Sequence, residues 1–347
     1  MIPMTTRIAF LVAFLMAFSP TIASAKLKVV ASTSTYASLA TDIGGDKVEV
    51  FAIASPDQDV HFVRPKPSFV PLLANADLLL TTGMDLELWL PSLIDKAGNE
   101  KIREGQIGYV AVADGVKKLE IPKTADRSNG GVHIYGNPHI VTSPLNIRRA
   151  AQNIAIGLCK VDPGNQAYYE ARLANFRARL DEALFGKDLV KLVGAPTLLR
   201  LAQNGSLQTF LQKRKFRGRS MAELLGGWMK KATPLYGKKI VTYHKNWVYF
   251  TMLFRLEIVG EIEPKPAIPP SPKHVEEVIN LMNKLSVRVV LAADYFDEGK
   301  INRICSSVDA TPVIVPLYVK GRPELDDYFK LVDFWLDQLL TAYGETP

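Results

Sequence analysis

Cysteine is scarce in this chain, which has only Cys159 and Cys305 among 347 residues. Two thiols cannot build a thiolate zinc cluster, and we expect these two, at the ends of helices in different lobes, to stay unbridged. The His-Glu-x-x-His run typical of many zinc hydrolases is also missing. Long apolar runs are equally few, because after the N-terminus no segment is apolar enough to span a membrane.

The N-terminal residues 1–25 have the pattern of a secretory signal. Arg7 precedes an apolar run over residues 8–18, and Ala23-Ser24-Ala25 provides a small-residue cleavage site. The alternative is a retained membrane anchor, but the run is shorter than the roughly 20 residues that a spanning helix needs. We therefore expect cleavage, a mature chain from Lys26 and a periplasmic, soluble protein.

The composition predicts two globular lobes. The chain is 48% hydrophobic and 22% charged, and it is too long for one small domain. Its net charge of +7 is partly local, because five basic residues crowd one short stretch: Lys213, Arg214, Lys215, Arg217 and Arg219. That stretch could contact anionic lipid or a membrane partner, although a solvated loop is the simpler interpretation. Nucleic acid is a poor partner for an exported protein, and we expect a monomer.

Short apolar runs alternate with helical ones in both halves of the chain. Expected strands cover residues 28–32, 48–54, 77–82, 107–113, 239–243, 258–262, 287–293 and 312–319. Strands this apolar indicate parallel sheets covered on both faces. Residues 188–236 read as mostly helical, and the stretch 165–185 reads as one uninterrupted helix. The predicted fold is α/β, with lobes over 26–164 and 188–347 joined by a long interdomain helix within 165–187.

Three histidines follow these predicted strands. His61 lies in a proline-rich loop after one strand, His244 ends another, and His139 stands between Pro138 and Pro144 ahead of a long helix. Ligands of open α/β sheets bind beyond the carboxyl ends of the strands, so histidines from both lobes can meet in one cleft. Three imidazoles suit zinc. His133 is a weaker candidate, more simply a mobile surface residue, and His274 at a helix start is expected to be exposed.

The ordered motifs resemble those of the solute-binding proteins of zinc and manganese ABC transporters, the cluster A-I or zinc-uptake family. They are Val30–Thr33, Asp59-Val60-His61, Arg64–Ser68, Asn75-Ala76-Asp77, Asn137-Pro138-His139 and Tyr243–Phe250, and together they cover nearly all of the mature chain. The resemblance implies two α/β lobes joined by a rigid helix. It also implies that His61, His139 and His244 bind the metal.

The chain departs from the family at the fourth ligand. Members commonly have an aspartate after the last strand, where this chain has Lys320. Asp294, at the end of the strand 287–293, is the substitute candidate, with a helix cap or an imidazole acceptor as its other interpretations. Asp59 is a further candidate, although a role in the loop is simpler. The long His-rich loop of many zinc-specific relatives is missing.

The resemblance predicts a protein that binds a divalent metal and hands it to an ABC-transporter permease. His244 stands where manganese-selective relatives often have glutamate, and a nitrogen-rich ligand set favours Zn²⁺ over Mn²⁺ or Fe²⁺. Since binding needs neutral imidazoles, we expect affinity to fall as pH drops through about 6.5. The rivals are an exported zinc-dependent hydrolase and an exported adhesin or structural protein with incidental histidines.

Overall fold

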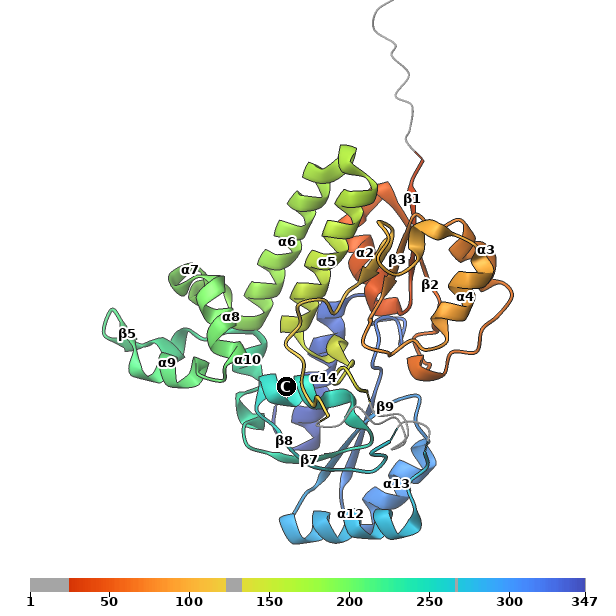
Figure 1. Ribbon diagram of the computed structural model, residues 1–347. Helices are drawn as coiled ribbons and strands as arrows, with labels where there is room; N and C mark the ends of the chain where they lie inside the picture. The colour runs from red at the N-terminus through yellow and green to blue at the C-terminus, as the bar shows by residue number, and fades with distance from the viewer. Residues whose placement is uncertain (1–24, 123–132, 266–267, 347) are drawn as a thin grey trace, which may run out of the picture.

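Two four-stranded parallel sheets form the framework of the protein (Figure 1). The computed structural model describes residues 25–122, 133–265 and 268–346, so the predicted signal sequence lies almost wholly outside the described residues. The first sheet has the order β2-β1-β3-β4, and the second has the order β10-β9-β7-β8. If the strands of each sheet are numbered along the chain from one to four, both sheets have the order 2-1-3-4. This confirms the predicted two-lobed α/β fold.

The first sheet is buried by helices on both sides. Its strands are β1 (Leu27–Ala31), β2 (Val48–Ala52), β3 (Leu78–Thr81) and β4 (Tyr109–Ala111), and its helices are α2 (Ser34–Gly44), α3 (Phe69–Ala74), α4 (Leu90–Ala97) and α5 (Pro144–Val161). All four residues of β3 are buried, as expected for a central parallel strand. Helix α2 packs on β1 and β2, and α5 packs on β3 and β4.

The second lobe has the same construction. Its strands are β7 (Lys239–Thr242), β8 (Glu257–Glu261), β9 (Val289–Ala293) and β10 (Thr311–Val315), and its helices are α11 (Val248–Phe254), α12 (Pro272–Leu285), α13 (Glu298–Ser307) and α14 (Tyr328–Ala342). Helix α14 packs on β10 and reaches α2 of the first lobe. The last predicted strand is too long, because Pro316 has no N–H group for the ladder and the chain then turns to the first lobe. There the Val319 carbonyl accepts a hydrogen bond from Ser34 Oγ at 2.6 Å.

The long predicted helix is present as α6 (Gln166–Phe185). It packs against α2 and α5 of the first lobe and against the short helix α10 (Gly227–Lys231). Where α6 ends, a Cβ atom on Gly186 would lie 2.7 Å from the Cα atom of Gly226, and Gly226 N donates to Phe185 O at 2.9 Å. Only glycines allow these two backbones to approach so closely.

A further segment projects from α6 towards the left of Figure 1. It contains α7 (Lys187–Val193), α8 (Ala195–Gln203), α9 (Leu207–Lys213) and a small antiparallel hairpin of β5 (Lys215–Phe216) and β6 (Arg219–Ser220). The stretch 188–236 is mostly helical, as expected, and this short hairpin interrupts it. Strands of two residues are too short to give an alternating apolar pattern in the sequence.

Two other predictions are settled by the described residues. Cys159 and Cys305 are both free, as expected. No helix among these residues combines the length and the apolar character that crossing a bilayer requires.

Candidate metal site

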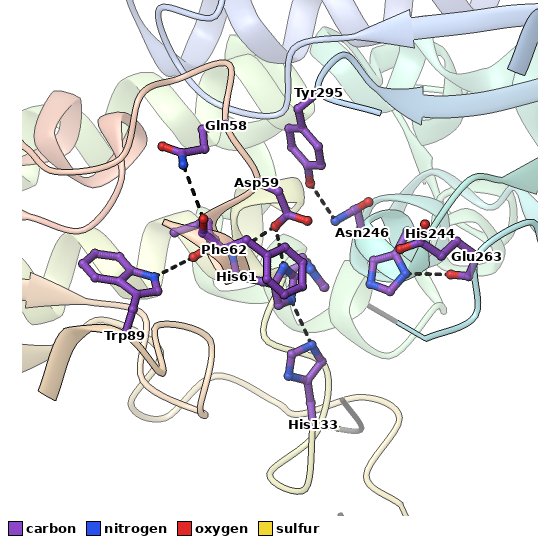
Figure 2. A network of polar contacts seen from close by, with 12 residues as sticks. Gln58, Asp59, His61, Phe62, Trp89, His133, His244, Asn246, Glu263 and Tyr295 are labelled. Atoms are coloured by element: carbon purple, nitrogen blue, oxygen red, sulfur yellow. Dashed lines mark hydrogen bonds and ion pairs between the residues drawn. The ribbon is translucent and has the colours of Figure 1, made fainter. Parts of the chain in front are cut away.

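His61 is held by its own loop. The chain leaves β2, and Asp59 begins a short 3-10 turn over Val60–Phe62 by accepting a hydrogen bond from His61 N at 3.0 Å. The same carboxylate oxygen lies 2.6 Å from His61 Nδ1, so Nδ1 donates to it and Nε2 is left as the free ring nitrogen (Figure 2). Trp89 Nε1 donates to the carbonyl of Val60 at 2.7 Å and fixes the turn.

His139 is fixed by its neighbour Asn137. The side-chain oxygen of Asn137 lies 2.9 Å from both the backbone nitrogen and the Nδ1 atom of His139. A short 3-10 turn, Ile140–Thr142, and helix α5 follow at once, so the backbone direction is set on the far side too. The His139 side chain is buried, with 1% of its surface exposed. Its Nε2 atom finds no hydrogen-bond partner among the described residues.

His244 follows the last residues of β7, as its position in the sequence predicts. Its Nδ1 atom donates to the carbonyl oxygen of Glu263 at 2.7 Å, and only 3% of the residue is exposed. Its Nε2 atom is also buried without a partner among the described residues. In all three histidines, therefore, a bond at Nδ1 places the lone pair on Nε2, the tautomer that a metal ligand needs.

The three rings converge in one place. Ring centroids lie 5.1 Å apart for His61 and His139, 5.6 Å for His139 and His244, and 6.0 Å for His61 and His244. These residues are separated by up to 183 positions in the chain, so only the fold brings them together. The predicted meeting of the three histidines is confirmed.

His133 joins this cluster, so it is not an isolated surface residue. Its Nε2 atom lies 3.1 Å from His61 Nε2 (Figure 2), and its ring centroid lies 5.7 Å from that of His139. One nitrogen each from His61, His133 and His139 lies within 4.8 Å of the other two. Two imidazole nitrogens that bind one tetrahedral Zn²⁺ at about 2.0–2.1 Å stand about 3.3 Å apart, so the observed spacing suits a shared cation.

Burial keeps His133, His139 and His244 neutral. It lowers the pKa of His133 to about 3 and that of His244 to about 4, and it lowers the pKa of His139 well below its usual value. The neighbouring imidazoles add to the effect because two protonated rings would repel each other. Protons therefore compete with a metal for His133 and His244 only well below about pH 6.5, the value at which the sequence led us to expect metal affinity to fall.

Asp59 and Asp294, the two carboxylates considered as ligands, have pKa values shifted in opposite directions. Burial by itself raises the pKa of Asp59, but the hydrogen bond from His61 and the histidine charges outweigh it and leave that pKa below its usual value. Asp294 follows β9, where burial raises its pKa to about 6. Its Oδ1 atom is buried without a hydrogen-bond partner among the described residues. Asp294, like His244, is not in the group of ligand atoms that lie within 4.8 Å of one another, and its role as a ligand stays a prediction.

His274 lies outside the cluster. Its side chain is half-buried rather than exposed as expected, and its Nε2 atom lies 2.9 Å from the carbonyl oxygen of Glu261. This contact gives it a structural role in the second lobe.

The segment that carries His139 is bonded to the second lobe, which the sequence did not indicate. Asn137 Nδ2 donates to the Lys245 carbonyl at 2.8 Å, and Thr142 Oγ1 donates to the Asn246 carbonyl at 3.0 Å. Tyr249 OH donates to the Asn137 carbonyl at 2.8 Å and accepts from Leu119 N at 3.2 Å. His139 thus follows the first sheet in the chain but is fastened to the loop after His244.

Buried imidazoles that meet between two α/β lobes form a candidate site for a divalent metal. The comparisons agree, since a family model described as "Zinc-uptake complex component A periplasmic" matches residues 29–184 and 219–342. The chain belongs to this family, whose members are substrate-binding components of metal ABC transporters.

Solved structures of similar proteins share the fold. A zinc-bound deletion mutant of ZnuA superposes with a TM-score of 0.67 at 22% identity, over 93% of this chain and 100% of that one. A manganese-bound periplasmic metal-binding protein from Candidatus Liberibacter asiaticus gives a TM-score of 0.63 at 17% identity, over 91% of this chain and 99% of that one.

Relatives with known cargo carry different metals. The manganese lipoprotein PsaA of Streptococcus pneumoniae (strain TIGR4) is 29% identical over 193 residues, which cover 53% of this chain and 58% of PsaA. The iron lipoprotein MtsA of Streptococcus pyogenes serotype M1 is 30% identical over 166 residues, 46% of this chain and 49% of MtsA. The chain thus spans about half the length of these relatives. Nothing in the comparisons supports a zinc hydrolase.

Proposed function

We propose that this protein captures a divalent transition metal, most readily zinc, outside the cytoplasmic membrane and delivers it to an ABC permease. The observation that carries the proposal is the convergence of four imidazoles, two of them with Nε2 atoms 3.1 Å apart. A buried nitrogen without a hydrogen-bond partner costs free energy because it has lost its contact with water, and a bound cation removes that cost. The site then serves binding rather than catalysis.

The donor set favours zinc. Neutral imidazole is a borderline ligand that suits Zn²⁺ well, whereas Mn²⁺ prefers carboxylate and other oxygen donors. We assign His61, His133, His139 and His244 as the nitrogen donors, with Asp59 orienting the His61 ring through Nδ1. Asp294 is the candidate oxygen donor. Manganese or ferrous iron is the alternative cargo, in keeping with the names of PsaA and MtsA.

The proposed lobes are residues 26–164 and 188–347, with α6 within 165–187 as a rigid connection. Because the segment of His139 is bonded to the loop after His244, opening the lobes separates His61 from these two rather than His139 from His244. Small movements of the His61 loop then release the metal.

Calorimetric titration of metal-free protein tests the proposal. We expect tight zinc binding, a weaker manganese signal, and displacement of manganese by zinc in competition. His244→Ala should weaken zinc binding strongly, and Asp294→Asn should weaken it only if that carboxylate is a ligand. Absence of zinc binding by the folded protein, or unchanged affinity in His244→Ala, would falsify the assignment.

A further inference from the structure

Nearly all of the excess positive charge of this protein lies in one segment. Residues 185–218, which we call the basic segment, contain seven lysines and arginines and one aspartate, a net charge of +6 out of +7 for the whole chain. The family model matches the chain on both sides of this segment but not across it. Its charge is therefore not explained by the fold that the family match covers.

The basic segment is folded, and its charges point outwards. Leu189 of α7, Leu198 of α8 and Leu211 of α9 are fully buried, so each helix is fastened to the rest of the protein. The basic residues are all exposed: Lys187, Lys191, Arg200, Lys213, Arg214, Lys215 and Arg217. The packed helices thus carry an exposed and strongly positive surface.

The hairpin at the outer end adds an aromatic side chain to this charge. Arg217 and Gly218 form its two-residue turn, both with positive φ (50° and 81°), as tight hairpin turns of this kind require. Phe216, paired with Arg219, is 39% exposed, and the Arg217 guanidinium lies 5.3 Å from its ring centroid. In Figure 1 this hairpin stands at the tip of the segment, away from both sheets.

We propose that the hairpin and α9 form a docking surface for the anionic phospholipids of the membrane that holds the permease. Lysine and arginine side chains are attracted to anionic lipid headgroups, and each such residue near the surface strengthens binding roughly fivefold. An aromatic side chain beside them suits the boundary between headgroups and acyl chains. The inference rests on the proposed location outside the cytoplasmic membrane, because only there does the surface meet the lipid.

Co-sedimentation with vesicles tests the proposal, using the full-length protein. We expect binding to phosphatidylcholine vesicles that contain phosphatidylglycerol, and none to pure phosphatidylcholine. Binding should disappear at about 1 M salt, where the Debye length is about 3 Å. Replacing Lys213, Arg214, Lys215 and Arg217 by Gln should weaken binding by about a thousandfold, and Phe216→Ala should weaken it less.

A matched variant separates this surface from overall charge. It replaces four exposed lysines elsewhere by Gln, namely Lys96, Lys101, Lys273 and Lys284, and should bind the vesicles as the wild type does. An equal loss in this variant, equal binding to both vesicle types, or binding only when the permease is present in the vesicles would overturn the proposal. Zinc titration of each variant should give wild-type affinity, so a failure here is distinct from a failure of the proposed transport role.

Discussion

The histidines of the site are held in two different ways. His139 and His244, the tied pair, belong to segments that hydrogen-bond each other across the two lobes through Asn137, Lys245 and Tyr249. His61 and His133, the loop pair, are held by short-range contacts within the first half of the chain, such as the bond between His61 and Asp59. We therefore expect the tied pair to be preformed and the loop pair to adjust to the proposed metal.

Loss of a ligand from the tied pair should have the largest effect. Structural zinc sites gain about 10–16 kcal/mol in all, so one of four ligands is worth about 3 kcal/mol, on the order of a hundredfold in affinity. We expect His139→Ala to lose that much, because a water molecule cannot enter its buried position easily. His133→Ala should lose less, since water can replace a ligand on the loop side.

Zinc dissociation constants from competition with a chelator measure this difference, with His274→Ala as a control outside the cluster. Equal losses for His139→Ala and His133→Ala would remove the distinction between the pairs.

Acid should destabilise the metal-free protein through its buried histidines. The unfolded chain takes up a proton on His244 near pH 6.5, whereas the folded protein does so only near pH 4. The folded state therefore keeps the full contribution of this residue above pH 6.5 and loses it as the pH falls towards 4, on the order of 3 kcal/mol.

Urea unfolding of metal-free protein at a series of pH values measures the loss, and His244→Gln should flatten the curve. A stability that is constant from pH 7 to pH 4 in the wild type would contradict the neutral, buried state of the ring.

Removal of the Tyr249 hydroxyl is the smallest and most specific test of the hydrogen bonds that connect the His139 segment to the second lobe. Tyr249→Phe removes a group that donates to the Asn137 carbonyl and accepts from Leu119 N, which we expect to cost about 1–2 kcal/mol of stability. Zinc affinity should fall only a few-fold, because all four imidazoles remain. Thermal unfolding with and without zinc measures both effects. Tyr236→Phe is the matched control, because its hydroxyl donates to Met229 O and accepts from Gln208 Nε2 rather than bonding the segments of the site. An equal fall in its zinc affinity would count against a specific role of the Tyr249 hydroxyl.

The sequence predicted the fold and three of the clustered histidines for a clear reason. Parallel strands are continuously apolar and end at one edge of a sheet, so the pattern places a residue directly after such a strand, like His244, near that edge. His61, which follows β2 only after a loop, and His139 were selected also through the family resemblance. Helix α6 was equally readable, since its apolar positions repeat at helical spacing over twenty residues.

Features that depend on loop conformation could not be predicted from the sequence. His133 follows a polar stretch without periodicity, so nothing in the sequence placed its ring beside His61. Helix α4 begins only at Leu90, because Met84 and Asp85 take left-handed conformations and the buried Glu87 carboxylate accepts from Thr82 N at 2.8 Å. Such a choice rests on long-range contacts, which local patterns do not encode.

The contact between Gly186 and Gly226 has a consequence far from the histidines. An alanine at position 186 would place its Cβ atom 2.7 Å from the Cα atom of Gly226, so the end of α6 and α10 would have to move apart, and we expect the lobes to shift with them. The spacing of nitrogens that belong to opposite lobes would then drift by fractions of an ångström, which is enough to spoil a tetrahedral shell. We therefore expect the proposed metal site to depend on two glycines that do not contact it.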